Sequence, residues 1–172
     1  MKKALLLVVV LACFSCVEKK KEQTPEIHWD QKKSVDMNKK MAEDQEIKIK
    51  LFLAQHTDWK VEKTGSGLYY FIYTSGNGEQ AQIGMLAQVD LKISLLDGTE
   101  CYKTNADEID EFKIDRSDIE TGVQEGIKKM KIGDRAKLII PSHLAHGLVG
   151  DLNKIPPLTT IVVDIHLIDL KL

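Results

Sequence analysis

The sequence has few of the residues that mark several protein classes. Its 172 residues include only three cysteines and four prolines, and its formal net charge is −2. This near balance of charge argues against a nucleic-acid-binding surface. The 11 glycines follow no repeat, which argues against fibrous and solenoid designs. Since 43% of the residues are hydrophobic, a mostly disordered chain is excluded, and the composition indicates one compact domain with a smaller additional segment.

Long apolar runs are also scarce, and the most prominent one lies at the N-terminus. After a short basic start, residues 4–14 are almost entirely apolar. This run is shorter than the roughly 20 residues of a membrane-spanning helix, but it is typical of a secretory signal. Cys16 follows Ser15 directly after the run, an arrangement that resembles the lipobox of bacterial lipoproteins. In those proteins the cysteine thiol receives a diacylglycerol and becomes the new N-terminus.

We therefore predict that residues 1–16 are a lipoprotein signal peptide and that Cys16 carries the lipid. The protein would be attached to a membrane of the bacterial cell envelope, on the periplasmic side. Cys13 is the alternative lipid site, and a plain secretory signal is the alternative to both. Beyond the signal only Cys101 remains, so a chain lipidated at Cys16 has no disulfide and depends on packing for its stability.

The next two segments differ in composition from the rest of the chain. Residues 17–33 are rich in Lys, Glu and Gln, which indicates a solvated tether. Residues 34–58 form the predicted helical lead-in, because residues 34–56 contain no Gly or Pro and place Met37 and Met41 at helical spacing. The alternation of Ile47, Ile49, Leu51 and Leu53 also fits a strand. A helix here would pack on the main domain or pair with a second copy of the chain to give a homodimer.

Residues 59–172 alternate strand patterns with one helix pattern. Strands are predicted over 68–73, 85–95, 99–103, 135–140 and 161–167. The first is β-branched and aromatic and lies between glycines, and apolar residues alternate with polar ones over 85–95 and 161–167. Ser117 and Glu120 have the spacing of a capping box, so a helix is predicted to begin there. Gly126 inside this helix suggests close approach to a strand. The pattern indicates an α+β fold, an antiparallel sheet with one amphipathic helix against it.

Several motifs, in order, resemble the FKBP family of peptidyl-prolyl isomerases. They are the string over residues 122–141, Leu144-Ala145-His146-Gly147, Ile155-Pro156-Pro157 and the strand over 163–167. The resemblance covers residues 64–172. With its lipobox and helical lead-in, the chain also resembles the gliding-motility-associated isomerase lipoproteins of Bacteroidetes.

The resemblance implies an FKBP-like fold and catalysis of cis–trans isomerisation at X-Pro bonds of unfolded or partner polypeptides. The barrier to this rotation is about 18–20 kcal/mol because it breaks amide resonance. A catalyst can lower the barrier by burying the proline ring, desolvating the carbonyl and donating a hydrogen bond to the rotated oxygen. The resemblance implies no metal, nucleotide or other cofactor.

The family binds proline in an aromatic cup, and its positions can be carried over one by one. Tyr102, His146 and Ile155 match the positions predicted to act in catalysis. The predicted substrate-binding positions are Leu91, Cys101, Phe112, Ile119, Glu120, Val123 and Val163. Asp110 is the alternative to Phe112, because a deletion in this region blurs the register.

Most of these positions depart from the family pattern: only Ile155 and Phe112 keep the family's residue, and Ile119 is a close substitute. Val123 replaces the tryptophan that forms the floor of the cup, and His146 replaces a tyrosine, although a neutral imidazole still carries one N–H donor. Glu120 either places a charge on an apolar wall or serves as the cap partner of Ser117. Two functions therefore remain, an isomerase and a non-catalytic FKBP-like chaperone or assembly module. An open cup beside His146 would favour catalysis, and a cup filled by Val123, Val163 and Tyr102 would favour binding alone.

Overall fold

The computed structural model describes residues 30–105 and 108–172. In chain order, its elements are α1 (Gln31–Ala54), β1 (Glu62–Lys63), β2 (Tyr69–Thr74), β3 (Leu86–Leu95), β4 (Glu100–Lys103), β5 (Asp110–Lys113), α2 (Thr121–Ile127), β6 (Arg135–Ile140), the 3-10 helix η1 (Ser142–Leu144) and β7 (Ile161–Lys171). The predicted signal peptide, both candidate lipid sites Cys13 and Cys16, and all but the last residues of the predicted tether lie outside the described residues. No helix in the described ranges is long and apolar enough to cross a membrane.

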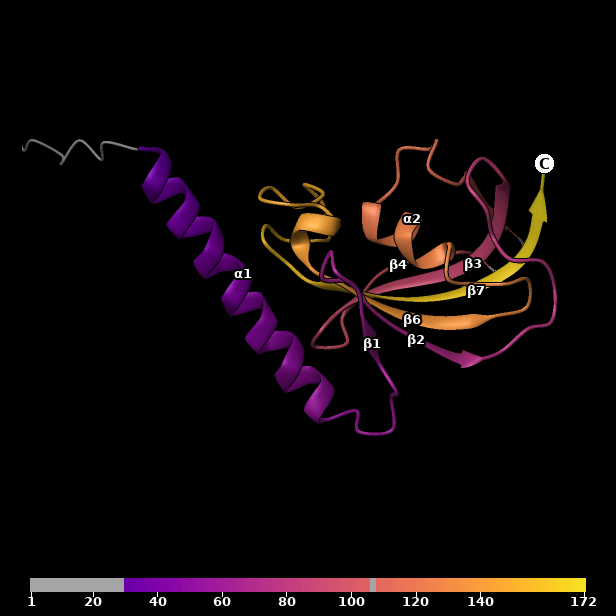
Figure 1. Ribbon diagram of the computed structural model, residues 1–172, viewed down its shortest axis with the longest axis horizontal. Helices are drawn as coiled ribbons and strands as arrows, with labels where there is room; N and C mark the ends of the chain where they lie inside the picture. Colours follow the sequence, from indigo (N-terminus) through magenta and orange to yellow (C-terminus); the bar gives the residue numbers. More distant parts are fainter. Residues whose placement is uncertain (1–29, 106–107) are drawn as a thin grey trace, which may run out of the picture.

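The strands form one antiparallel sheet in the order β1-β2-β6-β7-β3-β4, and β5 also pairs with β3 (Figure 1). The long strands β3 and β7 pair along their whole length, from Leu86 opposite Lys171 to Leu95 opposite Ile161. The α+β prediction is confirmed. The sequence missed β1 and β5, because segments of two and four residues are too short to show an alternating pattern.

One face of the sheet carries the main hydrophobic core, with α2 packed on it. Val123 and Ile127 of α2 are buried in the same cluster as Leu138 and Ile140 of β6. The helix lies very close to the strand, since a Cβ atom added at Gly126 would lie 2.6 Å from Leu138 Cδ1. The close approach predicted from Gly126 is therefore observed. Any larger residue at this position would require the fully buried Leu138 side chain to shift.

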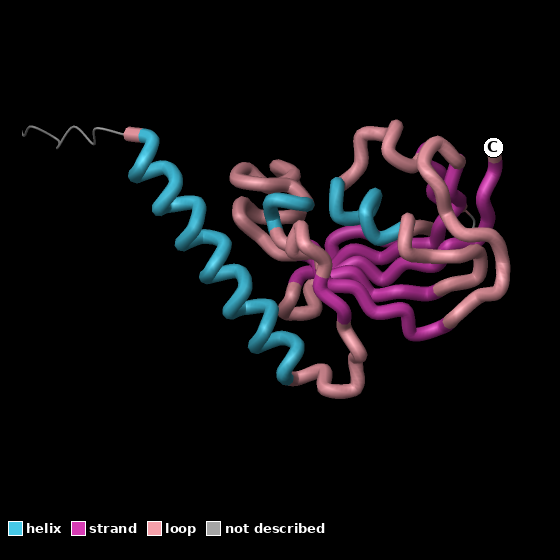
Figure 2. The backbone as a smooth tube through the Cα atoms, viewed as in Figure 1, coloured by secondary structure: helices cyan, strands magenta, loops and turns pink. Residues whose placement is uncertain are grey.

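The opposite face of the sheet is covered in part by α1. Tyr69, Ile139 and Val162 alternate with main-core residues along β2, β6 and β7, so their side chains point away from α2. Ile49 of α1 is 1% exposed and packs against these three. The helix predicted for residues 34–58 is thus observed as α1, and the strand alternative for Ile47–Leu53 is wrong. Figure 2 shows the two helices on different sides of the strands.

The predicted start of α2 is wrong. The helix begins at Thr121, its N-cap is Glu120, and no side chain caps it. The Ser117 hydroxyl instead accepts a hydrogen bond from the Lys113 N–H at 2.8 Å. The capping-box spacing occurs here in a turn that follows β5, so a short local motif did not determine the helix boundary.

Candidate active site

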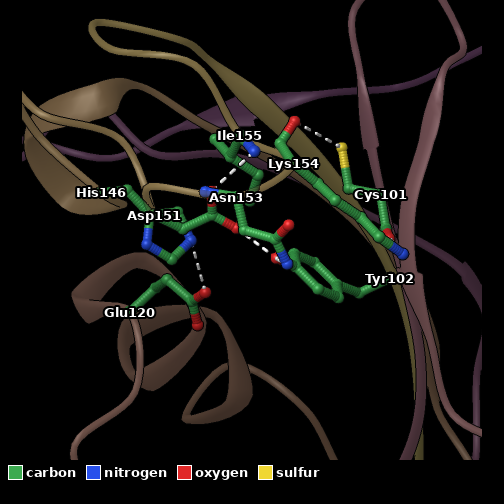
Figure 3. Close-up of polar contacts among 8 residues, drawn as sticks. All are labelled: Cys101, Tyr102, Glu120, His146, Asp151, Asn153, Lys154 and Ile155. Carbon is green, nitrogen blue, oxygen red and sulfur yellow. Dashed lines mark hydrogen bonds and ion pairs between the residues drawn. The ribbon is translucent and has the colours of Figure 1, made fainter.

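The loop of residues 141–160, between β6 and β7, carries three residues of the candidate site, His146, Asp151 and Ile155. It folds back so that these side chains meet Glu120 at the start of α2 and Tyr102 of β4 (Figure 3). Tyr102 lies 18 positions from Glu120 and 53 positions from Ile155 in the chain, and the fold brings all three into one region of the molecule.

The structure gathers the predicted apolar positions in one cluster. Ile155, Val123 and Val163 are 2%, 2% and 0% exposed. The other members are Cys101 and Phe112, both buried, and Leu91, Tyr102 and Ile119, which are partly buried. Of the two alternatives on β5, Phe112 is buried in this cluster, and Asp110 is exposed. Val123 and Val163 are therefore core residues, and their side chains present almost no surface to a substrate.

Asp151 is the centre of a hydrogen-bonded network at the edge of this cluster. Its Oδ2 atom accepts a hydrogen bond from the Tyr102 hydroxyl. Its Oδ1 atom accepts from the backbone N–H groups of Asn153 at 2.9 Å and Ile155 at 2.8 Å. The Asn153 side-chain amide donates to the Tyr102 hydroxyl oxygen at 3.2 Å. The network fixes the middle of the loop against β4.

These contacts change the acidity of both partners. Partial burial by itself would raise the pKa of Asp151, but hydrogen bonds from Tyr102, Asn153 and Ile155, together with the charge of His146, outweigh it and lower the pKa to about 2. The same hydrogen bond raises the pKa of the Tyr102 phenol. Asp151 is therefore ionised and Tyr102 protonated across the physiological pH range.

Lys154 fixes the loop to β4 at a second point. Its Nζ atom donates to the Cys101 carbonyl at 2.7 Å, and the Cys101 thiol donates weakly to the Lys154 carbonyl at 3.8 Å. Burial raises the pKa of the Cys101 thiol, so the group stays protonated and can act as this donor. Cys101 thus serves as a buried contact in the structure rather than as a nucleophile.

Glu120 and His146 contact each other on the other side of Asp151. His146 Nε2 lies 2.9 Å from Glu120 Oε1, and the two side chains are 25% and 16% exposed. Although the atoms are close, Nε2 has no well-aligned hydrogen bond within the described residues and is itself shielded from solvent. Of the two alternatives for Glu120, the helix cap with Ser117 is wrong, because the Glu120 carboxylate lies against the imidazole.

Two open hollows flank this group of residues. A hollow of about 490 Å³ lies beside His146 and is lined by Asp118, Ile119, Glu120, Thr121, Ala145 and His146. A second, of about 460 Å³, lies on the β4 side and is lined by Glu100, Cys101, Tyr102, Lys103, Thr104, Asn105 and Lys154. The first hollow is large enough for a prolyl residue, but only Ile119 and Ala145 give it an apolar wall.

The sequence did not reveal Asp151, Asn153 or Lys154 as members of the site. The spacing of Asp151 and Asn153 is that of an Asx turn, which indicates a local bend. It contains no information about Tyr102, which lies 49 positions away in the chain. Among the described residues, no group of three or more His, Cys, Asp or Glu side chains is placed to hold a metal ion.

Comparison with known proteins identifies the family. Residues 77–168, more than half of the chain, match the family model described as FKBP-type peptidyl-prolyl cis-trans isomerase. The chain belongs to this family. It is 36% identical over 134 residues to the FKBP-type peptidyl-prolyl cis-trans isomerase FkpA of Escherichia coli K12, covering 77% of this chain and 48% of FkpA. It is 35% identical over 127 residues to FkpA of Buchnera aphidicola, covering 73% and 50%.

A solved structure gives the same result for the fold. The crystal structure of FkpA from Escherichia coli superimposes with a TM-score of 0.66 and 30% sequence identity, and the match covers 80% of this chain and 64% of that one. The chain spans about half the length of the two curated relatives named above. The FKBP-type fold and family predicted from the sequence are confirmed.

Proposed function

We propose that this protein catalyses cis–trans isomerisation of X-Pro bonds in polypeptides of the bacterial cell envelope, and that the hollow beside His146 is its active site. The observation that carries this proposal is that His146, at a position that matches the family's pocket, lines an open hollow of about 490 Å³. Ile155 and Tyr102, at two further matching positions, lie in the same group of residues, with Tyr102 lining the second hollow. Family membership supplies the reaction class.

The reaction requires no covalent chemistry from the protein. Cis and trans X-Pro bonds differ by only about 0.5–1 kcal/mol, so the enzyme has to stabilise the twisted amide between them. The proline ring would contact Ile119 and Ala145, the apolar part of the hollow. Taking the amide out of water weakens the resonance form with separated charge, which lowers the cost of rotation.

His146 is the proposed donor to the rotating carbonyl. A carboxylate is only an acceptor, so Glu120 favours a proton on the His146 Nε2 atom 2.9 Å away. That N–H has no aligned acceptor in the described structure, so it is available once the Glu120 side chain turns aside. In this arrangement Glu120 covers the donor until a substrate enters.

An isomerisation assay on the full chain in mild detergent tests this proposal. The substrates are short peptides with Leu or Phe before Pro. We expect a rate well above the uncatalysed one. His146→Ala should lower kcat/KM about tenfold, the value of one hydrogen bond used in the transition state. Glu120→Ala uncovers Nε2 and should keep or raise the rate. An unchanged rate in His146→Ala would contradict the proposed role of the imidazole.

Binding without turnover is the second candidate function, and two observations favour it. Val123 and Val163 are fully buried and leave no deep apolar floor, and most of the hollow is lined by polar side chains. A folded protein that isomerises no faster than background, yet suppresses aggregation of an unfolded client, would establish an FKBP-like chaperone or assembly module instead.

The location and assembly of the protein are further parts of the proposal. We propose that a lipid on Cys16 attaches the chain to an envelope membrane, as the lipobox-like pattern indicates, and that the chain functions like the gliding-motility-associated lipoproteins it resembles. We also propose that α1 pairs two copies, since Val35 and Met37 are 59% and 41% exposed on it. Mass spectrometry of the Cys16→Ser and Cys13→Ser variants identifies the lipid site. Light scattering of Val35→Lys measures the pairing.

A further inference from the structure

A buried glutamine connects α1 to the loop of the candidate active site. Gln45 is 8% exposed, although glutamine is usually found at the surface. Its Nε2 atom donates to Ser142 Oγ at 2.8 Å. Its Oε1 atom accepts from the Ser142 N–H at 2.8 Å and from the Thr160 hydroxyl at 3.4 Å. The side-chain amide therefore uses both its donor and its acceptor on one loop.

The residues that Gln45 binds are the two ends of that loop. Ser142 is the second residue after β6, and Thr160 is the last residue before β7. Both are buried, at 3% and 4% exposure. Gln45 therefore holds the beginning and the end of the loop together, and His146, Asp151 and Ile155 lie on the segment between them.

Backbone hydrogen bonds extend from this clamp to the imidazole. The Ser142 carbonyl accepts from the N–H groups of Ala145 at 3.0 Å and Gly147 at 2.7 Å, which are the two neighbours of His146. The Gly147 carbonyl in turn accepts from the Leu158 N–H at 3.0 Å. A displacement of Ser142 would therefore change the position of the segment that carries His146.

Ser142 has no substitute for this partner. Within the described residues its N–H and its hydroxyl each make one hydrogen bond, and both go to Gln45. A buried N–H without a partner is strongly disfavoured, so loss of the glutamine amide would drive Ser142 toward water or another conformation.

We propose that Gln45 is a positioning residue for the active site, acting through Ser142 to hold His146 in place. This inference rests on the proposed isomerase function for its consequence in catalysis, but the clamp itself can be tested without catalysis. It assigns α1 a role in the chemistry of a site that the helix does not touch.

The experiment compares Gln45→Met with Ile114→Val in the full chain. Methionine keeps the size of the side chain and removes both polar groups. Ile114 is a fully buried core residue outside the loop, so its variant is the control for a general loss of stability. Gln45→Glu keeps the shape and an acceptor oxygen, and we expect it to restore part of the effect.

The first measurement is amide hydrogen exchange at Ala145, Gly147 and Leu158. We expect these three amides to exchange about tenfold faster in Gln45→Met and within about twofold of wild type in Ile114→Val. The second is the isomerase assay, in which Gln45→Met should lower kcat about tenfold and leave KM within about twofold, because a misplaced donor affects the twisted state most.

The outcomes separate this inference from the proposed function. If the wild-type protein does not isomerise X-Pro bonds, the proposed function fails, and the exchange rates alone decide whether the clamp exists. Exchange in Gln45→Met equal to wild type would overturn the inference whatever the activity. Faster exchange in Gln45→Met with an unchanged kcat would also overturn the inference. Gln45 would then hold the loop, but the position of His146 would not depend on Gln45.

Discussion

The two helices cover opposite faces of one sheet and are held there by different means. Five of the seven residues of α2 are buried, and its glycines let the helix touch β6 directly. The much longer α1 contributes two buried residues, Gln45 and Ile49. Figure 1 shows its N-terminal part extending away from the sheet. Length is therefore a poor guide to how much a helix contributes to this fold.

The two faces of the sheet are held to their helices by different kinds of contact. On the α2 face, stability comes from apolar burial, and the candidate site lies at the edge of the core. On the α1 face, a small cluster around Ile49 docks the helix, and one polar clamp at Gln45 connects it to the site loop. We expect substitutions on the first face to affect folding and those on the second to affect docking and loop position.

The largest effect should come from filling the space between α2 and β6. A Cβ atom at Gly122 would lie 2.3 Å from Ile140 Cγ2, a branched atom that cannot rotate away without moving the side chain. Gly122→Leu should lower the free energy of unfolding by about 3 kcal/mol, as measured by urea denaturation. Thr121→Leu, on the neighbouring exposed position, is the control. Equal stability of the two variants would contradict close packing as the reason for the glycine.

A smaller effect should follow from removing the apolar contact of α1. Ile49→Ala should cost about 2 kcal/mol of stability, at the low end for a buried isoleucine because its cluster is small. The matched control is Ile47→Ala on the same helix, whose side chain is 56% exposed against 1% for Ile49. It should change stability by less than about 0.5 kcal/mol. Similar losses in both variants would show that α1 is not docked through Ile49.

The acid sensitivity of the site loop should change when the Tyr102 hydroxyl is removed. The pKa of Asp151 in the folded protein is about 2, below the value of about 3.9 for an unfolded chain. The stability that the folded protein gains from ionised Asp151 is therefore complete above about pH 4 and is lost as the pH falls toward 2. Tyr102→Phe removes one of the hydrogen bonds that lower this pKa, so the pKa should rise and the loss should shift to higher pH.

Carboxyl-carbon NMR titration of Asp151 measures that shift. Tyr70→Phe is the control, because the Tyr70 hydroxyl donates to Glu62 at the other end of the sheet. An Asp151 titration that is the same in Tyr102→Phe and wild type would show that the backbone N–H groups of Asn153 and Ile155, with the charge of His146, keep this pKa low without the Tyr102 hydroxyl.

The smallest effect is expected on the exposed part of α1. Lys39 and Glu43 form an ion pair at 3.9 Å with side chains 75% and 64% exposed. Glu43→Ala should change the free energy of unfolding by no more than about 0.5 kcal/mol, since solvent screens such pairs. Thermal unfolding in low and high salt checks this. A loss above 1 kcal/mol would contradict the view that α1 is held only near Gln45 and Ile49.

Most of the fold could be predicted from the sequence. The alternation over residues 85–95 predicted β3 within one residue, and the absence of Gly and Pro over residues 34–56 predicted α1. The predicted start of α2 at Ser117 was wrong, because the side chain that appeared to cap the helix bonds to Lys113 instead. Local spacing indicates which residues can form a cap, whereas competing partners nearby decide whether they do.

The candidate site was predictable only in part. Family motifs supplied Tyr102, His146 and Ile155 as candidates, whereas Asp151 and Gln45 have no motif of their own. Gln45 in particular lies among charged residues that are typical of an exposed helix, and nothing adjacent to it in the chain indicates that it is buried.

By itself the sequence determined the class of fold, the family and the position of the main strands, because hydrophobic periodicity and ordered motifs are local properties of the chain. Only the tertiary structure decided that Glu120 contacts His146, that Asp151 accepts from Tyr102 and that Gln45 closes the loop. These contacts join residues 26 to 115 positions apart. Their partners are chosen when the sheet folds the loop against β4, α1 and α2 and buries polar groups that must find hydrogen bonds.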